Sequence, residues 1–308
     1  FNLPDNSNFA AVGRWNGSSY VGAGERFKVV SEGIDGGKCL RAYIDAGTAH
    51  NATLLFNYDA PVALGNKVFT SVWVKHRVTG SVTPGQWKFG RWQKSTNSLS
   101  DKASECYWNS NIGTPDHKIQ VRDYRGVGGF SADITVHTGD YTRAAGSFDW
   151  LPHGRDKWVR MDILHTLATS YDAAGQYKCS AWLHDPDGLL PPVFCDFTDN
   201  GPTDAVNPYG QAGDEWMQHL YQNYFGNGDY GSATHDLWLS DCYESVGDFK
   251  LVEIANHADL TLATRRFIVP EISWADTQIQ VRGFTGGMTG AKWLHTVVNG
   301  VSTSVRAV

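Results

Sequence analysis

The feature that most constrains the fold is a long series of short runs rich in β-branched and aromatic residues, with little helical periodicity anywhere. Clusters of Gly, Pro, Asn, Asp or Ser separate most of these runs, which is typical of antiparallel strands in a sandwich or barrel. The sequence contains no repeat of about 20 to 50 residues, which disfavours a propeller or solenoid. The predicted strands cover residues 38–45, 67–78, 85–94, 117–124, 132–138, 157–167, 176–185, 216–225, 235–245 and 249–255.

The aromatic content is high, at 13%, and the chain has 12 Trp and 33 Gly among 308 residues. This mixture suits a large all-β core with glycine-rich turns. It suits equally well a protein that stacks flat rings on flat ligands such as sugars. Composition alone leaves both interpretations open.

Charge and hydropathy exclude some classes of protein. The formal net charge is −6, and no basic stripe points to a nucleic-acid partner. The sequence contains no run of 18 apolar residues, so it predicts no membrane span. Because the chain begins at Phe1 rather than Met, we expect a mature or trimmed protein, and we expect it to be secreted or extracellular.

The five cysteines include no CxxC pair, so a zinc ribbon is not predicted. Cys179 and Cys195 flank the turn signal "DPDG" at 185–188, and a hairpin about that turn would bring them almost opposite each other. A disulfide between them would imply an oxidising compartment. Two buried free thiols are the other interpretation.

The character of the sequence changes near residue 257. Residues 257–308 contain short strand-like runs and glycine turns, which predict a small C-terminal β module or a sheet extension packed on the main domain, residues 1–256. So short a segment buries little core by itself.

The order of five segments resembles the concanavalin A-like jelly rolls over roughly residues 15–255: "GGKCLRAYI", "SVWVKH", "WKFGRW", "KWVRMDI" and "DLWLSDCYESVGDFKLVEI". The resemblance implies an all-β jelly-roll sandwich with an open groove for a polysaccharide on its concave sheet. Lectins, hydrolases and lyases share this architecture, so the fold alone assigns no activity.

The stretch "YQNYFGNGDYGS", residues 221–232, resembles the motif Tyr-Phe-Lys-Ala-Gly-x-Tyr-x-Gln of jelly-roll alginate lyases. The matching positions are Tyr224, Phe225, Gly228 and Tyr230, and the differing ones are Gly226, Asn227 and Ser232. The resemblance implies that Tyr230 donates a proton to the leaving glycosidic oxygen. Asn227, in the same loop, is a candidate substrate-binding residue.

β-Elimination from a uronate requires groups that neutralise the charge developing on the sugar carboxylate, and a residue that moves protons. Arg91 and Gln93 are two residues apart and therefore share one face of a strand. With Tyr224, Tyr230 and His165 they form the candidate catalytic set. The structural alternatives are a surface ion pair for Arg91, packing between sheets for Tyr224 and a place at the core edge for His165.

Hydrolysis is less well supported. Hydrolytic members of this class carry Glu-x-Asp-x-(x)-Glu on one strand, and the sequence has no such triplet. In "SDCYES" Asp241 and Glu244 are an odd number of positions apart, which predicts that they lie on opposite faces of the strand and do not form a catalytic pair.

Alternation in "FTSVWVKH" places Trp73 and Lys75 opposite Val72 and Val74. If the valines face the core, Trp73 and Lys75 face the groove or solvent. Trp87 is a further candidate on the face of Arg91, and an exposed Trp beside a cation suits an acidic sugar. A tryptophan buried beneath a loop is the alternative.

The sequence offers one candidate metal site. The resemblance implies a structural calcium near the last strand, with Asp241 and Asp236 as candidate ligands, and no cofactor is expected for the chemistry.

The leading hypothesis is thus a secreted lyase that cleaves an acidic polysaccharide. The alternatives are a non-catalytic lectin or binding module, and a viral or cell-surface adhesion protein.

Overall fold

The computed structural model describes residues 11–12, 14–21, 27–34, 36–45, 51–79, 85–94, 105–112, 119–124, 133–136, 158–171, 177–184, 193–198, 209, 212–226, 234–263, 265–269, 271–275, 278–281 and 290–308. All regular elements in these residues are strands, so the all-β prediction is confirmed. Every predicted run contains one of them. Within these ranges no helix has the length and apolar character needed to cross a membrane.

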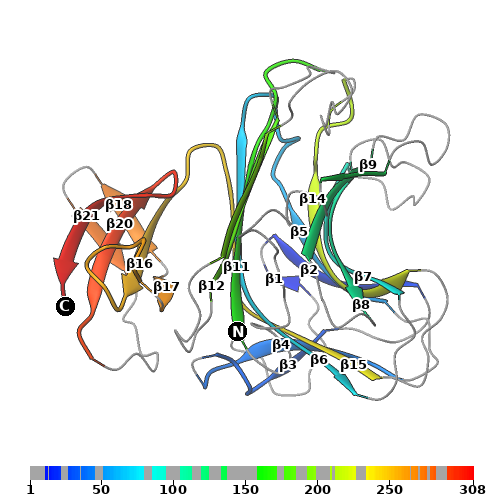
Figure 1. The fold of residues 1–308 in the computed structure, drawn as a ribbon, viewed down its shortest axis with the longest axis horizontal. Helices are drawn as coiled ribbons and strands as arrows, with labels where there is room; N and C mark the ends of the chain where they lie inside the picture. The colour runs from blue at the N-terminus through cyan, green and yellow to red at the C-terminus, as the bar shows by residue number, and fades with distance from the viewer. Residues whose placement is uncertain are drawn as a thin grey trace.

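The first large sheet has eight antiparallel strands. Their order is β1 (Ala11–Val12), β2 (Trp15–Val21), β5 (Asn51–Asn57), β14 (Gln218–Gly226), β7 (Gly85–Gln93), β8 (Glu105–Ile112), β9 (Ile119–Tyr124) and β10 (Asp133–Val136). Strand β14 lies between two strands from the first third of the chain. Figure 1 shows that β7, β8 and β9 curve strongly.

The second large sheet has seven antiparallel strands. Their order is β13 (Val193–Thr198), β12 (Lys178–His184), β11 (Val159–Thr166), β6 (Lys67–Thr79), β15 (Thr234–Val246), β4 (Cys39–Ile44) and β3 (Lys28–Val30). Here too a late strand, β15, pairs between two early ones. Neighbouring strands that are distant in sequence require connections that cross between the sheets, as in a jelly roll.

The main core lies between these two sheets. Val72 and Val74 of β6 and Leu237 and Leu239 of β15 pack in one cluster with Trp92 of β7. Alternate residues of each strand therefore point inward, as the period of a strand requires. The molecule is a β-sandwich, and the predicted fold class is confirmed.

The C-terminal module is a four-stranded sheet in the order β17 (Arg266–Val269), β16 (Lys250–Ala255), β20 (Trp293–Val298) and β21 (Val301–Ala307), with a hairpin of β18 (Glu271–Ala275) and β19 (Gln278–Val281). The predicted boundary at residue 257 falls inside this sheet, because β16 already belongs to it.

The module packs on the outer face of the seven-stranded sheet (Figure 1, left). Trp73 stacks on Phe267 with ring centroids 5.1 Å apart, and Phe69 stacks on Phe249 at 4.2 Å. The short module thus completes its core against the sandwich, which compensates for the small apolar interior of its own.

The predicted hairpin around residues 185–188 is formed by β12 and β13, but its cysteines are offset. Cys179 pairs with Phe197, and Cys195 pairs with Ala181. Diagonal positions lie about 7–8 Å apart, beyond the roughly 4.4–6.8 Å between the Cα atoms of most disulfides. The register therefore does not favour the predicted disulfide.

Candidate functional site

Arg91 and Gln93 lie on β7 in the middle of the eight-stranded sheet. Trp92 between them belongs to the main core, so the two polar residues share the face directed away from it. Leu220 and Gln218 of β14 are their register partners, and Gln93 Nε2 donates to Gln218 Oε1 at 3.5 Å. Both Arg91 and Gln93 are buried, with 3% and 2% of their surface exposed. The predicted common face is confirmed.

Tyr224 is on β14, the strand next to β7. A β-bulge between Tyr221 and Tyr224 shifts the register, so the backbone of Tyr224 pairs with Lys88 and that of Phe225 with Trp87. The side chains of Tyr224 and Trp87 are outside the described part of the structure, as are Asn227 and Tyr230 altogether. Adjacent strands thus carry Arg91, Gln93 and Tyr224, and their catalytic roles stay a prediction.

His165 lies elsewhere. It is on the inward face of β11 in the seven-stranded sheet, is fully buried, and its Nδ1 is 2.7 Å from the hydroxyl of Tyr177. Burial lowers the pKa of His165 well below its ordinary value, and the nearby His219 lowers it further. Because it shares the face of the core residues of its strand, His165 does not reach the face that carries Arg91.

The alternation predicted for β6 is confirmed, but the groove assignment of Trp73 and Lys75 is wrong. Trp73 is 2% exposed and lies against Phe267 of the C-terminal module. The ammonium of Lys75 sits 4.2 Å from the ring centroid of Trp238. Both residues are on the outer face of the seven-stranded sheet, whereas Arg91 is on the other sheet. The sequence could not reveal which sheet would contain β6.

Asp236 and Asp241, the calcium candidates, lie in different environments. Asp236 is buried and forms an ion pair with Arg41 at 2.7 Å. Asp241 is exposed and has a positive φ of 48° at a bulge of β15. No group of three or more potential metal ligands occurs among the described residues. The calcium site stays a prediction.

A buried carboxylate cluster, here called the inter-sheet network, was missed by the sequence analysis. The side chain of Glu244 is fully buried between the sheets and accepts hydrogen bonds from Thr70 Oγ1 at 2.9 Å and Tyr221 OH at 2.8 Å. Its other close neighbour is His219 Nδ1, at 2.5 Å. The carboxylate therefore ties β14 of one sheet to β6 and β15 of the other.

A β-bulge places Glu244 in this network. Leu239 of β15 faces the core, and regular alternation from there would send Glu244 outward. Between Ser240 and Tyr243 the strand contains one residue more than its partner β6, so Glu244 turns inward. Asp241, in the bulge, remains exposed.

Two phenols near Glu244 are held in their neutral form. Burial raises the pKa of Tyr58 and of Tyr221 well above the ordinary value, and the negative charge of Glu244 raises both further. Neutral hydroxyls act as hydrogen-bond donors, which is what a buried carboxylate requires.

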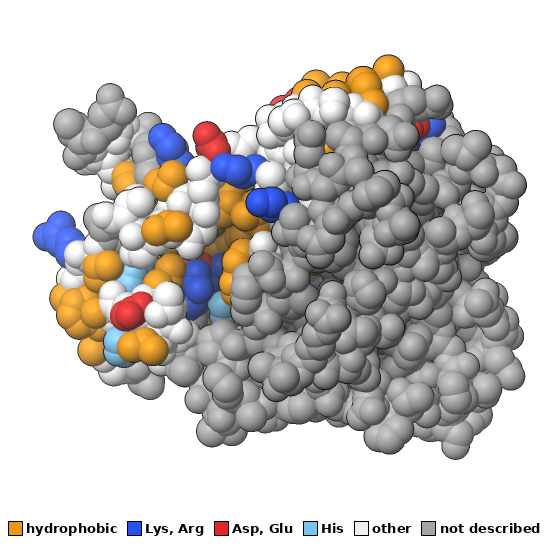
Figure 2. Space-filling view, turned by 45° about the horizontal axis from the view of Figure 1, so that its top comes forward, with side chains coloured by type: hydrophobic (Ala, Val, Ile, Leu, Met, Phe, Trp, Pro, Cys, Tyr) orange, Lys and Arg blue, Asp and Glu red, His pale blue; other side chains and the backbone are white. Residues whose placement is uncertain are grey.

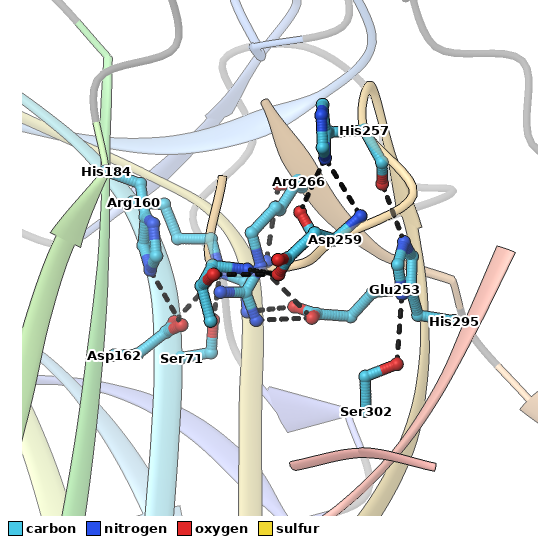
Figure 3. A network of polar contacts seen from close by, with 11 residues as sticks. Ser71, Arg160, Asp162, His184, Glu253, His257, Asp259, Arg266, His295 and Ser302 are labelled. Carbon is cyan, nitrogen blue, oxygen red and sulfur yellow. Dashed lines mark hydrogen bonds and ion pairs between the residues drawn. The ribbon is translucent and has the colours of Figure 1, made fainter. Parts of the chain in front are cut away.

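A second buried cluster, here called the seam network, joins the sandwich to the C-terminal module (Figure 3). Arg160 Nε donates to Asp162 Oδ1 at 2.8 Å, and Arg160 Nη2 forms an ion pair with Glu253 at 2.5 Å. Arg266 pairs with the same carboxylate at 2.5 Å, and His184 Nε2 lies 3.3 Å from Asp162. The sequence contained one signal for this network. Arg160 and Asp162 alternate with apolar residues along β11, so their side chains share the face of the strand opposite those apolar residues.

Comparisons with known proteins give no family. No family model matches the sequence, and no curated protein matches it. A solved structure of the cellulose-induced protein Cip1 is similar, with 12% identity and a TM-score of 0.46, over 75% of this chain and 91% of that one.

Two other similar structures differ in activity. An endo-β-1,4-glucuronan lyase from Trichoderma reesei has 10% identity and a TM-score of 0.46, over 78% of this chain and 93% of that one. Lectin II from Ulex europaeus has 12% identity and a TM-score of 0.43, over 79% and 100%. At these values the similarities assign no activity, and the sandwich rests on its own strand order.

Proposed function

We propose that this protein is a polysaccharide lyase that cleaves a uronate-containing chain by β-elimination on the outer face of the eight-stranded sheet. The observation that carries the proposal is the placement of Arg91 and Gln93 on one face of β7, beside the strand of Tyr224. Strand β14 ends at Gly226, which pairs with Gln86 of β7, and Tyr230 follows four residues later in the sequence.

In the proposed reaction a base removes the proton from C5 of the uronate, and its electron pair forms the C4–C5 double bond. The bond from C4 to the glycosidic oxygen breaks, and Tyr230 protonates the leaving oxygen. Arg91 and Gln93 bind the sugar carboxylate and stabilise the charge that develops there.

The test is to incubate the protein with alginate and glucuronan and to follow the absorbance of the unsaturated product. We expect Arg91→Met to lower kcat about 10²–10³-fold. Tyr230→Phe should lower it about 10²–10⁴-fold. Arg306→Met, which changes an exposed arginine of β21, is the matched control and should retain activity. Full activity of Tyr230→Phe, or no cleavage of any uronate polymer by the unaltered protein, would remove the lyase proposal.

A non-catalytic lectin is the second candidate. The net charge of −6 favours it, because an acidic protein does not attract polyanions electrostatically. Affinity electrophoresis distinguishes the two functions, since a lectin is retarded by the polysaccharide without releasing unsaturated product.

A further inference from the structure

A cavity lies at the seam between the sandwich and the C-terminal module. Its volume is about 650 Å³, and its walls come from β6, β11 and β12 on one side and from the module on the other. Figure 2 shows basic and histidine side chains recessed between the module, at left, and the body of the molecule. The volume is within the range of about 300–1,000 Å³ that small-molecule sites occupy.

The walls of this seam cavity are largely apolar. Phe69 of the sandwich faces Phe249, Leu251 and Val297 of the module. Trp182 of β12 adds a partly exposed indole. Such a surface suits a ligand with an apolar face, and an indole in particular suits a flat ring.

One end of the cavity is formed by the seam network. Burial is the largest single influence and by itself would raise the pKa of Asp162 and of Glu253, but the positive charge of Arg160 together with the other polar partners outweighs it and lowers both. His184 adds to the effect on Asp162, and Arg266 adds to the effect on Glu253. Both carboxylates are therefore ionised and hydrogen-bonded. A glycosidase needs one carboxyl group that can donate a proton, so this end is suited to binding rather than to hydrolysis.

Hydroxyl and carboxylate groups form another part of the lining. Asp259 Oδ1 accepts hydrogen bonds from the backbone N–H of Thr261 at 2.9 Å and from its Oγ1 at 2.7 Å. These bonds lower the pKa of Asp259, so it too is ionised. Ser302 Oγ lies 3.1 Å from His295 Nδ1 and also lines the cavity.

The charges of the lining decide which ligand fits. Two arginines stand against three carboxylates, Asp162, Glu253 and Asp259. His184 adds no charge near neutral pH, because burial lowers its pKa. One net negative charge remains, and both arginines are engaged with carboxylates, so an acidic sugar would meet repulsion.

We infer that the seam cavity binds an uncharged sugar unit, which stacks on Trp182 and hydrogen-bonds through its hydroxyls to Asp259, Thr261 and Ser302. Sugar hydroxyls can donate to a carboxylate and accept from a hydroxyl, which this lining requires. The inference does not rest on the lyase proposal, because the two sites are on different sheets and have opposite charge preference.

The test is a titration of the full chain with uncharged disaccharides (cellobiose, xylobiose, mannobiose and maltose), followed by calorimetry and tryptophan fluorescence. We expect at least one of them to bind, while glucuronic acid does not compete. Trp182→Ala should weaken binding about tenfold, which corresponds to about 1.4 kcal/mol. Thr261→Val, which preserves shape and removes one hydrogen-bonding hydroxyl, should weaken it about threefold to tenfold.

Tyr171→Ala and Thr303→Val are the matched controls, because both residues lie outside the cavity lining and should leave binding unchanged. Failure of all four disaccharides to bind would overturn the inference. Equal binding of glucuronic acid, binding of glucosamine alone, or full affinity in both Trp182→Ala and Thr261→Val would overturn it as well. Cleavage of uronate polymers is measured separately, so either proposal can fail without the other.

Discussion

The inter-sheet network and the seam network both bury carboxylates, but different groups compensate the charge. Glu244 lies among neutral hydroxyls and one histidine, between the two sheets of the sandwich. Asp162 and Glu253 are paired with the guanidinium groups of Arg160 and Arg266, between the sandwich and the C-terminal module. One network holds a single anion by hydrogen bonds, and the other is a set of balanced ion pairs.

The difference shows how each interface is specified. Within the sandwich, backbone pairing in two large sheets and a continuous core already fix the geometry, and short hydroxyl side chains suffice to solvate one anion. The module is small, and its position depends on side chains at the seam. Paired charges at defined positions favour one docking geometry over others, because a shifted module would leave charges buried without partners.

The largest expected effect is that of Arg160→Leu in the seam network. The change leaves Asp162 and part of Glu253 without their principal cation, and loss of one partner from a buried ion pair costs about 3–5 kcal/mol. Urea unfolding measures the loss. Arg306→Leu on exposed β21 is the control and should change stability little. A wild-type midpoint for Arg160→Leu would show that the pairing does not hold the seam.

The next effect is that of Glu244→Leu in the inter-sheet network. It leaves the hydroxyls of Thr70 and Tyr221 buried without an acceptor, and we expect a loss of about 1.5–3 kcal/mol in the free energy of unfolding. Glu244→Gln retains an acceptor oxygen and should lose less, about 1 kcal/mol. If Glu244→Leu proves more destabilising than Arg160→Leu, the ranking of the two networks is wrong.

The loss of stability at acid pH tests one buried histidine near each of the two networks. The pKa values of His165 and His184 are lowered in the folded state, so folding favours their neutral forms. The stability gained from these neutral histidines is fully present at pH values above the pKa of histidine in the unfolded chain, about 6.5. It is lost as the pH falls from there toward the lower pKa of the folded state. Stability should fall by at most about 1.4 kcal/mol per pH unit for each such proton.

We expect His165→Gln to flatten this acid slope more than His184→Gln, because Asp162 offsets part of the effect of burial on His184. Thermal unfolding between pH 7 and about pH 5 measures the slopes. Exposed His257→Gln is the control and should leave the slope unchanged. Equal acid slopes of stability in all three variants would show that His165 and His184 do not cause the loss of stability at acid pH.

The smallest expected effect is that of Arg266→Lys in the seam network. Arg266 uses two nitrogens on one oxygen of Glu253, and its side chain is 15% exposed. Lysine keeps the charge but not the planar fork, so we expect a loss of about 1 kcal/mol. The measurement is the shift of the urea midpoint. A loss as large as that of Arg160→Leu would mean that the two arginines contribute equally.

The strands and their inward faces could be predicted from sequence. Val72 and Val74 face the core and Trp73 faces away, because adjacent side chains of a strand alternate sides whatever the tertiary structure. The same rule placed Arg91 and Gln93 on one face. It could not say that β6 and β7 belong to different sheets, and for this reason the groove predicted to contain both Trp73 and Arg91 was wrong.

Local pattern thus determined by itself that the chain forms strands, and which side chains share a face on each regular stretch. Only the tertiary structure decided which sheet each strand joins, that the C-terminal module covers Trp73, and that the bulge in β15 turns Glu244 inward. The physical reason is that alternation is a property of a few neighbouring residues. Sheet membership and bulges depend instead on hydrogen bonds and packing between segments far apart in the chain.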